Sequence, residues 1–220
     1  MTSREKDAKE VISRHFDCSD SKNIGNGGEG GLTNNNIRAV YRYTGQSDSR
    51  ASEIVNPLLR YISKLPEDER VEYLNNSKEK IGFSTVKTFI KQMDEAISKV
   101  ELPPDLILYR GVDYQQLTDD IGYEIELGVI YGDAGFMSTS YMENVAYRFA
   151  IPHIFEDGDI ARRPIFVIKT KSGLFGAVSH NECEVILPRR IVLKCVDIID
   201  LDDRRYFIMD YLTVNSTMGV

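Results

Sequence analysis

The chain has 220 residues, of which 42% are hydrophobic and 28% charged, and this is the composition of an ordinary globular protein. Its formal net charge of -7 argues against a nucleic-acid-binding protein, because such binding depends on clustered Lys and Arg. The three cysteines, Cys18, Cys183 and Cys195, lack metal-ligand spacing. The sequence therefore predicts neither a disulfide framework nor a metal site, and it favours a reducing compartment.

The first 36 residues are predicted to be a flexible segment or leader ahead of one domain, residues 37–220. Within this segment, residues 4–16 can form a short charged helix, whereas residues 19–36 are rich in Gly, Ser and Asn, as linkers are. The chain shows no secretory signal and no apolar stretch of membrane-spanning length. We therefore expect a monomer without a membrane span, either cytoplasmic or delivered into the cytoplasm of a target cell as a toxin or effector.

A helical lobe is predicted for residues 37–104. Apolar residues recur at helix spacing in three stretches, residues 37–41, 54–62 and 83–93. Pro57 falls in the second stretch and is expected to start or kink a helix, because proline lacks a backbone donor. The pair Pro103-Pro104 ends the helical part.

A β core is predicted for residues 105–214, where the chain changes to short runs rich in β-branched and aromatic residues. One helix, near residues 143–150, interrupts these runs. Helices first and strands later indicate an α+β fold, with an amino-terminal helical part followed by a two-sheet, mostly antiparallel β core. The predicted strands lie at residues 106–109, 129–131, 165–168, 185–187, 191–199 and 206–214.

Glu182-Cys183-Glu184 places two carboxylates one residue apart at the head of an apolar run. In an extended strand, alternation points both acids to the same side. Such a pair suits chemistry at a sugar carbon, because one acid can stabilise a cationic ribose while the other orients or deprotonates a nucleophile. The alternative is an exposed loop ahead of a strand, in which Glu-x-Glu is common.

Two other predicted strand ends carry polar residues. Arg110-Gly111 ends the strand Leu108-Tyr109, and an arginine fork can bind a phosphate while glycine lets a ligand approach the backbone. Ser138-Thr139-Ser140 ends an apolar strand, and its hydroxyls can orient carboxylates and ribose hydroxyls. The alternatives are a solvent-facing arginine and a Ser/Thr turn that starts the next helix.

In this order, Arg110, Ser138-Thr139-Ser140 and Glu182-Cys183-Glu184 resemble the marks of the mono-ADP-ribosyltransferases of the arginine–serine–glutamate group. Upstream, residues 39–45 and 54–60 resemble the amino-terminal helices of the binary-toxin and clostridial exoenzyme transferases, with Val55 in place of the family's isoleucine. The resemblance covers roughly residues 37–214. It implies a domain of ADP-ribosyltransferase type that uses NAD as its substrate and needs no metal.

The resemblance also implies a dinucleotide site. Arg110 would bind a phosphate of NAD, and Gly111 would offer backbone groups to the nicotinamide amide. Five further positions match the nicotinamide and ribose pocket or the surroundings of the phosphates: Thr139 and Ser140 for the pocket, and Asn56, Arg60 and Arg163 for the phosphates. For Arg163, which follows Arg162, a solvated loop end is the alternative.

For catalysis, the resemblance implies that Glu184 binds the ribose and stabilises its cationic ring as nicotinamide leaves, and that Ser138 holds Glu184 by a hydrogen bond. Glu182 would set the acceptor, because a guanidinium needs an adjacent carboxylate to be drawn in and deprotonated. We therefore predict transfer of ADP-ribose to an arginine of a target protein. The alternatives are an NAD glycohydrolase, with water as acceptor, and a catalytically silent interaction module.

Residues 173–181 match the loop that recognises the protein substrate in relatives. Phe175 and His180 are the candidates for recognition, although a core position is favoured for Phe175 and an ordinary loop position is open for His180. The loop is shorter than in the binary toxins, and a second catalytic-type domain is not expected. The target protein is therefore not predicted from this resemblance.

Overall fold

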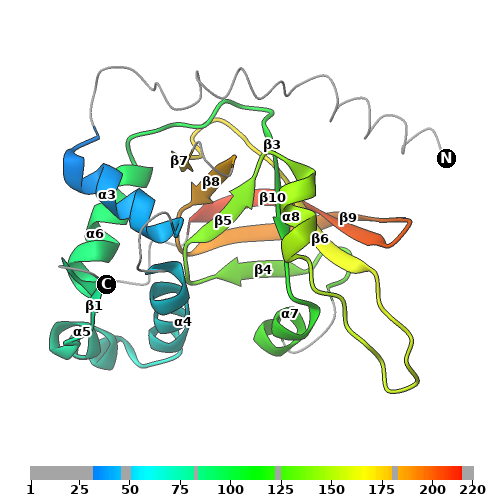
Figure 1. Cartoon of the computed structure of the whole chain (residues 1–220), viewed down its shortest axis with the longest axis horizontal. Coiled ribbons are helices and arrows are strands. Elements are labelled where there is room, and N and C mark those ends of the chain that lie inside the picture. The colour runs from blue at the N-terminus through cyan, green and yellow to red at the C-terminus, as the bar shows by residue number, and fades with distance from the viewer. Residues whose placement is uncertain (1–31, 46–50, 82–83, 122–124, 180–182, 215–220) are drawn as a thin grey trace.

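The computed structural model describes residues 32–45, 51–81, 84–121, 125–179 and 183–214. Among these residues, four helices come first and form a helical lobe with a small antiparallel hairpin (Figure 1). The helix expected at residues 4–16 lies outside the described residues. The lobe consists of α3 (Asn34–Tyr43), α4 (Ala51–Ser63), α5 (Glu67–Asn76), β1 (Lys80–Ile81), β2 (Ser84–Thr85) and α6 (Val86–Ile97).

Helix α3 begins at Asn34, so the last three residues assigned to the linker are helical. Thr33 caps the helix: its Oγ1 accepts a hydrogen bond from the Asn36 N–H (3.2 Å), and Asn36 Oδ1 accepts one from the Thr33 N–H (3.0 Å). This capping box satisfies donors that the first turn leaves unpaired. Asn36 is fully buried and also donates to the Gln92 carbonyl of α6 (3.1 Å), which fixes the start of α3 against the lobe.

Helix α4 continues through Pro57. Of the two expectations for this proline, a helix start or a kink, the helix start is therefore wrong. Pro57 is exposed, whereas Val55, Leu59 and Ile62 form a buried face of the helix. Packing of this face outweighs the one hydrogen bond that the proline removes. As a result α4 carries Asn56 and Arg60 one turn apart, on neighbouring positions of the helix surface.

The other strands form an eight-stranded sheet in the order β4-β9-β10-β6-β3-β5-β8-β7. Neighbours pair antiparallel, except that β6 and β10 are parallel. The predicted α+β fold with a mostly antiparallel β core is confirmed. The strands are β3 (Ile107–Gly111), β4 (Ile130–Asp133), β5 (Met137–Ser140), β6 (Arg163–Lys169), β7 (Ala177–Ser179), β8 (Glu184–Leu187), β9 (Ile191–Leu201) and β10 (Arg204–Val214).

Two helices interrupt these strands in the described part of the chain, α7 (Tyr114–Ile121) and α8 (Glu143–Phe149). The sequence predicts α8. The helix α7 is not among the predicted elements, although Tyr114, Leu117 and Ile121 recur at helix spacing within its eight residues. None of the helices in the described ranges has the length and apolar character that a membrane crossing requires.

The large sheet curls so that its two halves enclose one apolar core. Side chains from strands far apart in the order, Tyr131 of β4, Phe166 of β6 and Val185 of β8, belong to one buried cluster. Phe166 packs edge-on against Tyr131, with 5.1 Å between ring centroids. Each fully buried side chain of this size contributes about 1.5–3 kcal/mol, so core packing holds the two halves together.

The helical lobe docks on the β5–β8 part of the sheet. Phe136 and Ile186 from this part are buried among side chains of the helices, and Tyr43 packs edge-on against Phe136 with 5.8 Å between ring centroids. Asp94 of α6 adds an ion pair with Arg189 (2.8 Å). This docking places α4 opposite the ends of β3, β5 and β8, where the predicted site residues lie.

Candidate active site

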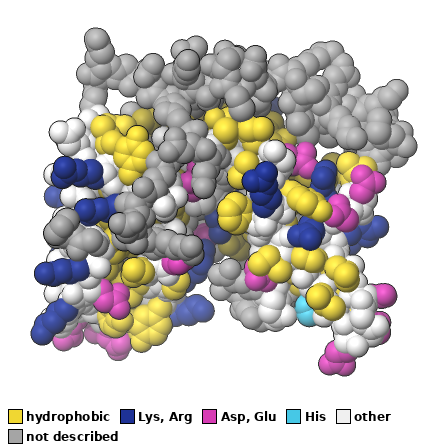
Figure 2. All heavy atoms as spheres, viewed as in Figure 1, with side chains coloured by type: hydrophobic (Ala, Val, Ile, Leu, Met, Phe, Trp, Pro, Cys, Tyr) yellow, Lys and Arg dark blue, Asp and Glu magenta, His cyan; other side chains and the backbone are white. Residues whose placement is uncertain are grey.

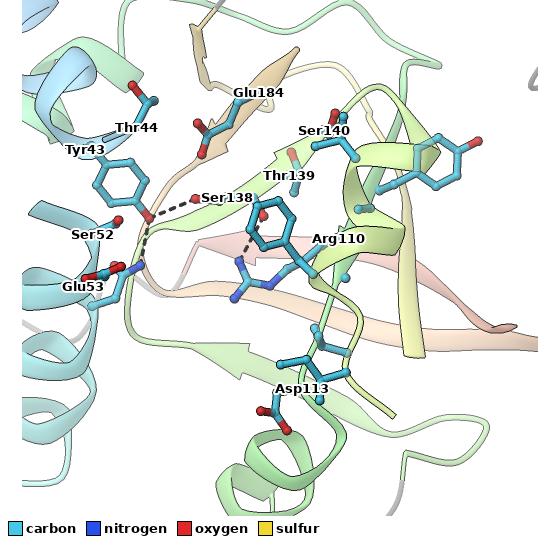
Figure 3. Close-up of a pocket in the computed structure, with 18 of the residues that line it drawn as sticks. Tyr43, Thr44, Ser52, Glu53, Arg110, Asp113, Ser138, Thr139, Ser140 and Glu184 are labelled. Carbon is cyan, nitrogen blue, oxygen red and sulfur yellow. Dashed lines mark hydrogen bonds between the residues drawn. The ribbon is translucent and has the colours of Figure 1, made fainter. Parts of the chain in front are cut away.

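A cavity of about 900 Å³ opens between the helical lobe and the sheet (Figure 3). This volume is typical of pockets that hold small-molecule substrates and cofactors. Residues of α3 and α4 form one wall, and the ends of β3, β5 and β8 form another. Eight of the predicted site residues line the cavity: Asn56, Arg60, Arg110, Gly111, Ser138, Thr139, Ser140 and Glu184.

Two arginines from different parts of the fold meet at one buried carboxylate. Arg60 of α4 donates from Nε and Nη2 to Oδ1 and Oδ2 of Asp133, at 3.0 and 2.9 Å. Arg110 Nη2 of β3 lies 3.7 Å from Asp133 Oδ2. The Gly135 N–H donates to the same carboxylate (2.9 Å). Within this cluster two guanidinium groups share one carboxylate, which leaves a local positive charge that suits an anionic ligand; Glu53 and Asp113 line other parts of the same cavity.

Arg110 extends from the end of β3 toward α4, as Figure 3 shows. Its Nη1 donates to the Ser138 carbonyl (3.0 Å). Its buried Nε has no hydrogen-bond partner among the described residues. A buried donor without a partner is costly, so an acceptor bound beside Arg110 would be stabilising. This geometry is compatible with the predicted phosphate contact.

Tyr43 is fully buried and ties the helical lobe to β5 (Figure 3). Its hydroxyl donates to the Phe136 carbonyl (3.0 Å) and accepts from Asn56 Nδ2 (2.8 Å) and Ser138 Oγ (3.3 Å). Burial, with a smaller contribution from the charge of Glu184, raises the pKa of Tyr43 to about 12. The hydroxyl is therefore protonated at neutral pH and remains a donor. The hydrogen bond predicted between Ser138 and Glu184 stays a prediction.

Asn56 holds the chain at the start of β5. Its Nδ2 donates to the Phe136 carbonyl (3.1 Å), and its Oδ1 accepts from the Phe136 N–H (3.0 Å). A Cβ on Gly135 would lie 2.9 Å from Asn56 Oδ1, so the glycine permits this approach. The side chain that the resemblance places beside the phosphates is thus engaged with the backbone of β5, and it shapes the cavity through that contact.

Two hydroxyls of β5 form hydrogen bonds with the backbone on both sides of Glu184. Thr139 Oγ1 donates to the Val185 carbonyl (2.6 Å), and Ser140 Oγ donates to the Cys183 carbonyl (3.0 Å). These carbonyls belong to the residues on either side of Glu184. The two side chains therefore fix the backbone from which Glu184 projects, in addition to lining the cavity.

Glu184 is the first residue of β8 and is buried in the cavity wall. Cys183 before it has a left-handed conformation, with φ of 52°. The expectation of an extended strand through residues 182–184 is therefore wrong, and strand alternation does not place the side chain of Glu182. Glu182 itself lies outside the described residues, as does His180.

Gly111 ends β3 directly beneath the last turn of α8. A Cβ at this position would lie 2.0 Å from the Ala146 carbonyl oxygen and 2.5 Å from the Ala150 nitrogen. Both atoms belong to the backbone, so no side-chain movement can relieve the overlap. A glycine is needed here for α8 to pack against β3, whatever the Gly111 backbone binds.

A protein-family model described as ADP-ribosyltransferase exoenzyme matches residues 5–215. The chain belongs to this family. The membership that the sequence motifs suggest is confirmed, and the chain is an NAD-dependent mono-ADP-ribosyltransferase. A search of curated proteins finds no match.

Solved structures of other ADP-ribosyltransferases share the fold of this exoenzyme. C3stau2 from S. aureus, solved with NAD, is 17% identical, with a TM-score of 0.61 over 90% of this chain and 96% of its own. The Vis toxin from Vibrio splendidus is 19% identical, with a TM-score of 0.57 over 99% and 90%. The enzymatic component C2-I of the C2-toxin from Clostridium botulinum is 19% identical, with a TM-score of 0.59 over 87% of this chain and 47% of its own.

Two predicted site residues of the exoenzyme do not line the cavity. Arg163, at the start of β6, donates from Nη1 to the Ala150 carbonyl (2.7 Å) and stacks on the Tyr147 ring, with 4.9 Å from its Cζ to the ring centroid. Phe175 is 37% exposed, so the core position favoured for it is wrong. It forms an isolated bridge with Glu101 at the surface, where a recognition role stays open.

Two residues that organise the site of this ADP-ribosyltransferase, Tyr43 and Asp133, are not among the site residues predicted from the sequence. Tyr43 belongs to the stretch 39–45 that resembles relatives, but the sequence assigns it no role, and it assigns none to Asp133. A signal for Asp133 exists, because it lies two residues after the apolar Tyr131 on β4 and therefore shares the face of the strand that points into the protein. An acid at such a position needs a cationic partner, and Arg60 and Arg110 are both predicted site residues.

Proposed function

We propose that this exoenzyme transfers ADP-ribose from NAD to an arginine side chain of a target protein and releases nicotinamide. The observation that carries the proposal is that one cavity holds both a buried carboxylate, Glu184, and the cationic cluster of Arg60 and Arg110. A substrate with a diphosphate at one end and a ribose that becomes cationic at the other matches this charge distribution. NAD is such a substrate.

The diphosphate of NAD would bind at Arg60 and Arg110. Asp133 holds the two guanidinium groups in place, so their orientation is set before the substrate arrives, and less ordering is required on binding. Arginine also suits a phosphate because its planar fork donates parallel hydrogen bonds. This end of the cavity would thus position the substrate and take no part in bond breaking.

Chemistry would occur at the nicotinamide ribose. The bond between the ribose carbon and the nicotinamide nitrogen breaks, its electron pair leaves with nicotinamide, and positive charge develops on the ribose ring. The Glu184 carboxylate would stabilise that charge. The backbone that carries it is held by the hydrogen bonds from Thr139 and Ser140. Because its position is set by hydrogen bonds to residues 183 and 185, little reorganisation is needed in the transition state.

Glu182 would prepare the acceptor. An arginine is protonated at neutral pH, so its nitrogen must give up a proton as it attacks the ribose carbon, and a nearby carboxylate can accept that proton. One similar structure, the ADP-ribosyltransferase Vis, is in complex with agmatine, which carries a guanidinium group. This supports a guanidinium as the acceptor here and provides a small test substrate.

The test is incubation of the full chain with NAD labelled in its adenylate part, together with agmatine or a cell lysate. We expect labelled agmatine and one or a few labelled proteins. Glu184→Gln should reduce both by at least about 100-fold, as expected for loss of a group that stabilises the transition state, while NAD still raises the melting temperature. Label transfer that survives this substitution would contradict the assigned role of Glu184.

The acceptor is tested separately at Glu182. Glu182→Gln should abolish transfer to agmatine and to proteins while nicotinamide is still released from NAD, since water can replace the acceptor. Nicotinamide release by the wild type with no label on any acceptor would identify an NAD glycohydrolase instead. Absence of any NAD-dependent change in melting temperature would identify a catalytically silent module.

We propose that the exoenzyme acts as a monomer in the cytoplasm of a target cell, as a toxin. Several proteins of the same fold, Vis and the C2-toxin component among them, are named as toxins. Expression of the wild type in a eukaryotic cytoplasm should arrest growth, and Glu184→Gln should not. Equal growth of cells that express either form at the same level would count against a toxic role.

A further inference from the structure

The last residue of α8 and the segment that leads from it to β6 carry a group of exposed apolar side chains. Phe149, Ile154 and Ile160 are 62%, 65% and 66% exposed, and Ile151 and Phe155 are exposed as well. Single apolar residues are normal on a protein surface, but a contiguous group indicates an interaction site. Residues 149–160, called the apolar hairpin below, project from the body of the protein (Figure 1), and hydrophobic side chains gather over this region in Figure 2.

The apolar hairpin has a defined backbone. Ile154 and Ile160 face each other in an antiparallel bridge, and the Phe155 N–H donates to the Asp159 carbonyl (2.8 Å). At its base, the His153 ring stacks on Tyr114 of α7, with 5.4 Å between ring centroids. The exposed side chains are therefore presented in a fixed arrangement, and a partner that binds them has less conformational entropy to remove.

The apolar surface is continuous with the active site. Phe149 and Ile151, at the start of the hairpin, line the cavity that holds Arg110 and Glu184. A partner seated on Ile154 and Ile160 would therefore lie at the mouth of the cavity. Such a position suits the macromolecule whose side chain must enter the cavity and react there.

The charges of the hairpin favour a basic partner. Its end carries Glu156, Asp157 and Asp159, all exposed, whereas the nearest basic residues, Arg148 and Arg162, flank its base and not its end. Carboxylates around an apolar patch attract a partner whose own patch has basic residues at its rim, and they repel an anionic membrane surface. The surface around a reactive arginine in a target protein can supply this positive charge.

We propose that the apolar hairpin is the docking surface for the protein that carries the acceptor arginine. The partner presents an apolar patch with basic residues at its edge. Hairpin contacts set the affinity for the protein acceptor and leave the reaction with small acceptors unaffected. This inference rests on the proposed transferase function, and its test separates the two by the use of agmatine.

The test compares wild type with the double variant Ile154→Ser/Ile160→Ser, neither residue of which lines the cavity. The probes are agmatine and the lysate protein that wild type labels most strongly. We expect protein labelling to fall at least tenfold, with unchanged agmatine transfer. The matched control is Leu127→Ser, because Leu127 is 68% exposed and lies outside both hairpin and cavity lining; it should label the protein at the wild-type rate.

Other outcomes overturn the docking inference. Protein labelling equal to wild type shows that the hairpin is not used, and a parallel loss of agmatine transfer shows that it acts in catalysis or folding. A wild-type dimer in sedimentation that the double variant converts to a monomer identifies a self-association surface. Wild-type binding to phosphatidylcholine–phosphatidylserine vesicles that the double variant loses identifies a membrane surface. Failure of wild type to modify agmatine refutes the proposed function itself.

A substitution that reverses one charge of the hairpin tests the proposed basic partner independently. Glu156→Lys should reduce protein labelling severalfold at low ionic strength, and the difference from wild type should shrink at about 0.5 M salt, where exposed charges are screened. Agmatine transfer should stay at the wild-type rate in both buffers. Unchanged or faster protein labelling by Glu156→Lys at low salt would refute the basic partner.

Discussion

Arg60 and Asp133 form a two-pronged ion pair that joins helix α4 to strand β4, with N–O distances of 3.0 and 2.9 Å. The Asp133 side chain is 1% exposed and that of Arg60 20%. Because α4 belongs to the helical lobe and β4 to the large sheet, this pair fixes two walls of the cavity relative to each other. Removal of one partner would leave a desolvated charge behind, which is strongly destabilising.

We therefore expect Arg60→Gln to lower the free energy of unfolding by about 3 kcal/mol, because Asp133 would keep only the hydrogen bond from the Gly135 N–H and, as its one cationic contact, the more distant Arg110 at 3.7 Å. The KM for NAD should also rise about tenfold, by analogy with charged hydrogen bonds that contribute 1.5–3 kcal/mol, while kcat changes less. Urea denaturation and initial rates with agmatine measure the two effects.

A surface ion pair of the same geometry provides the control. Arg205 donates from Nε and Nη2 to the two carboxylate oxygens of Asp200, at 2.8 and 3.0 Å, but both side chains are about one-third exposed. Arg205→Gln should therefore cost no more than about 1 kcal/mol and leave the KM for NAD unchanged. Equal losses of stability in Arg60→Gln and Arg205→Gln would show that burial does not decide the strength of this contact.

The spacing of apolar residues was enough to predict those helices and strands in which such residues repeat regularly. The strands at residues 165–168 and 191–199 are runs of β-branched and other apolar residues that contribute to one buried cluster, and the helix near 143–150 packs into a second cluster through Ala146 and Ala150. Helix α7 is only eight residues long, so its three apolar positions at helix spacing, Tyr114, Leu117 and Ile121, form a signal that is easily overlooked. The continuous path of α4 through Pro57 depends on tertiary packing, which local propensity does not include.

The order of the motifs in the sequence was enough to predict most residues of the site. It did not predict the hydrogen bonds and ion pairs among them. Arg110, Ser138 and Glu184 come together because β3, β5 and β8 are neighbours in the sheet. The role of Asp133 depends on which residues face it across 73 positions of sequence, and one chain does not reveal that pairing. The left-handed Cys183 was missed as well, because cysteine has no special preference for that conformation.

The close packing of α8 on Gly111 leads to a second prediction. Gly111→Ala should destabilise the protein by at least about 2 kcal/mol, since the new methyl group would lie 2.0 Å from the Ala146 carbonyl oxygen and α8 would have to move. Gly132→Ala, in a strand of the same sheet, is the matched control, because the nearest atom to its Cβ is 3.9 Å away. Thermal unfolding of both variants measures the difference; a Gly111→Ala protein as stable as Gly132→Ala would contradict the contact.

The buried hydroxyl of Tyr43 gives a prediction about alkaline pH. Its pKa in the folded protein is about 12, raised by burial from an ordinary value of 10.0. A raised pKa means that the folded state holds the proton more tightly, so this contribution to stability is complete below pH 10 and is lost as the pH rises through 12. The loss amounts to about 2–3 kcal/mol, because one pKa unit corresponds to 1.36 kcal/mol.

Tyr43→Phe removes this ionisation together with the hydrogen bonds to Phe136, Asn56 and Ser138. We expect the variant to be less stable than wild type at pH 8, since the Phe136 carbonyl and the Asn56 amide lose a partner. Between pH 10 and 12 the gap should narrow, because only wild type must desolvate a phenolate. Urea denaturation of both proteins at pH 8, 10 and 11.5 tests this, and a constant gap across these values would show that the Tyr43 hydroxyl is not buried in solution.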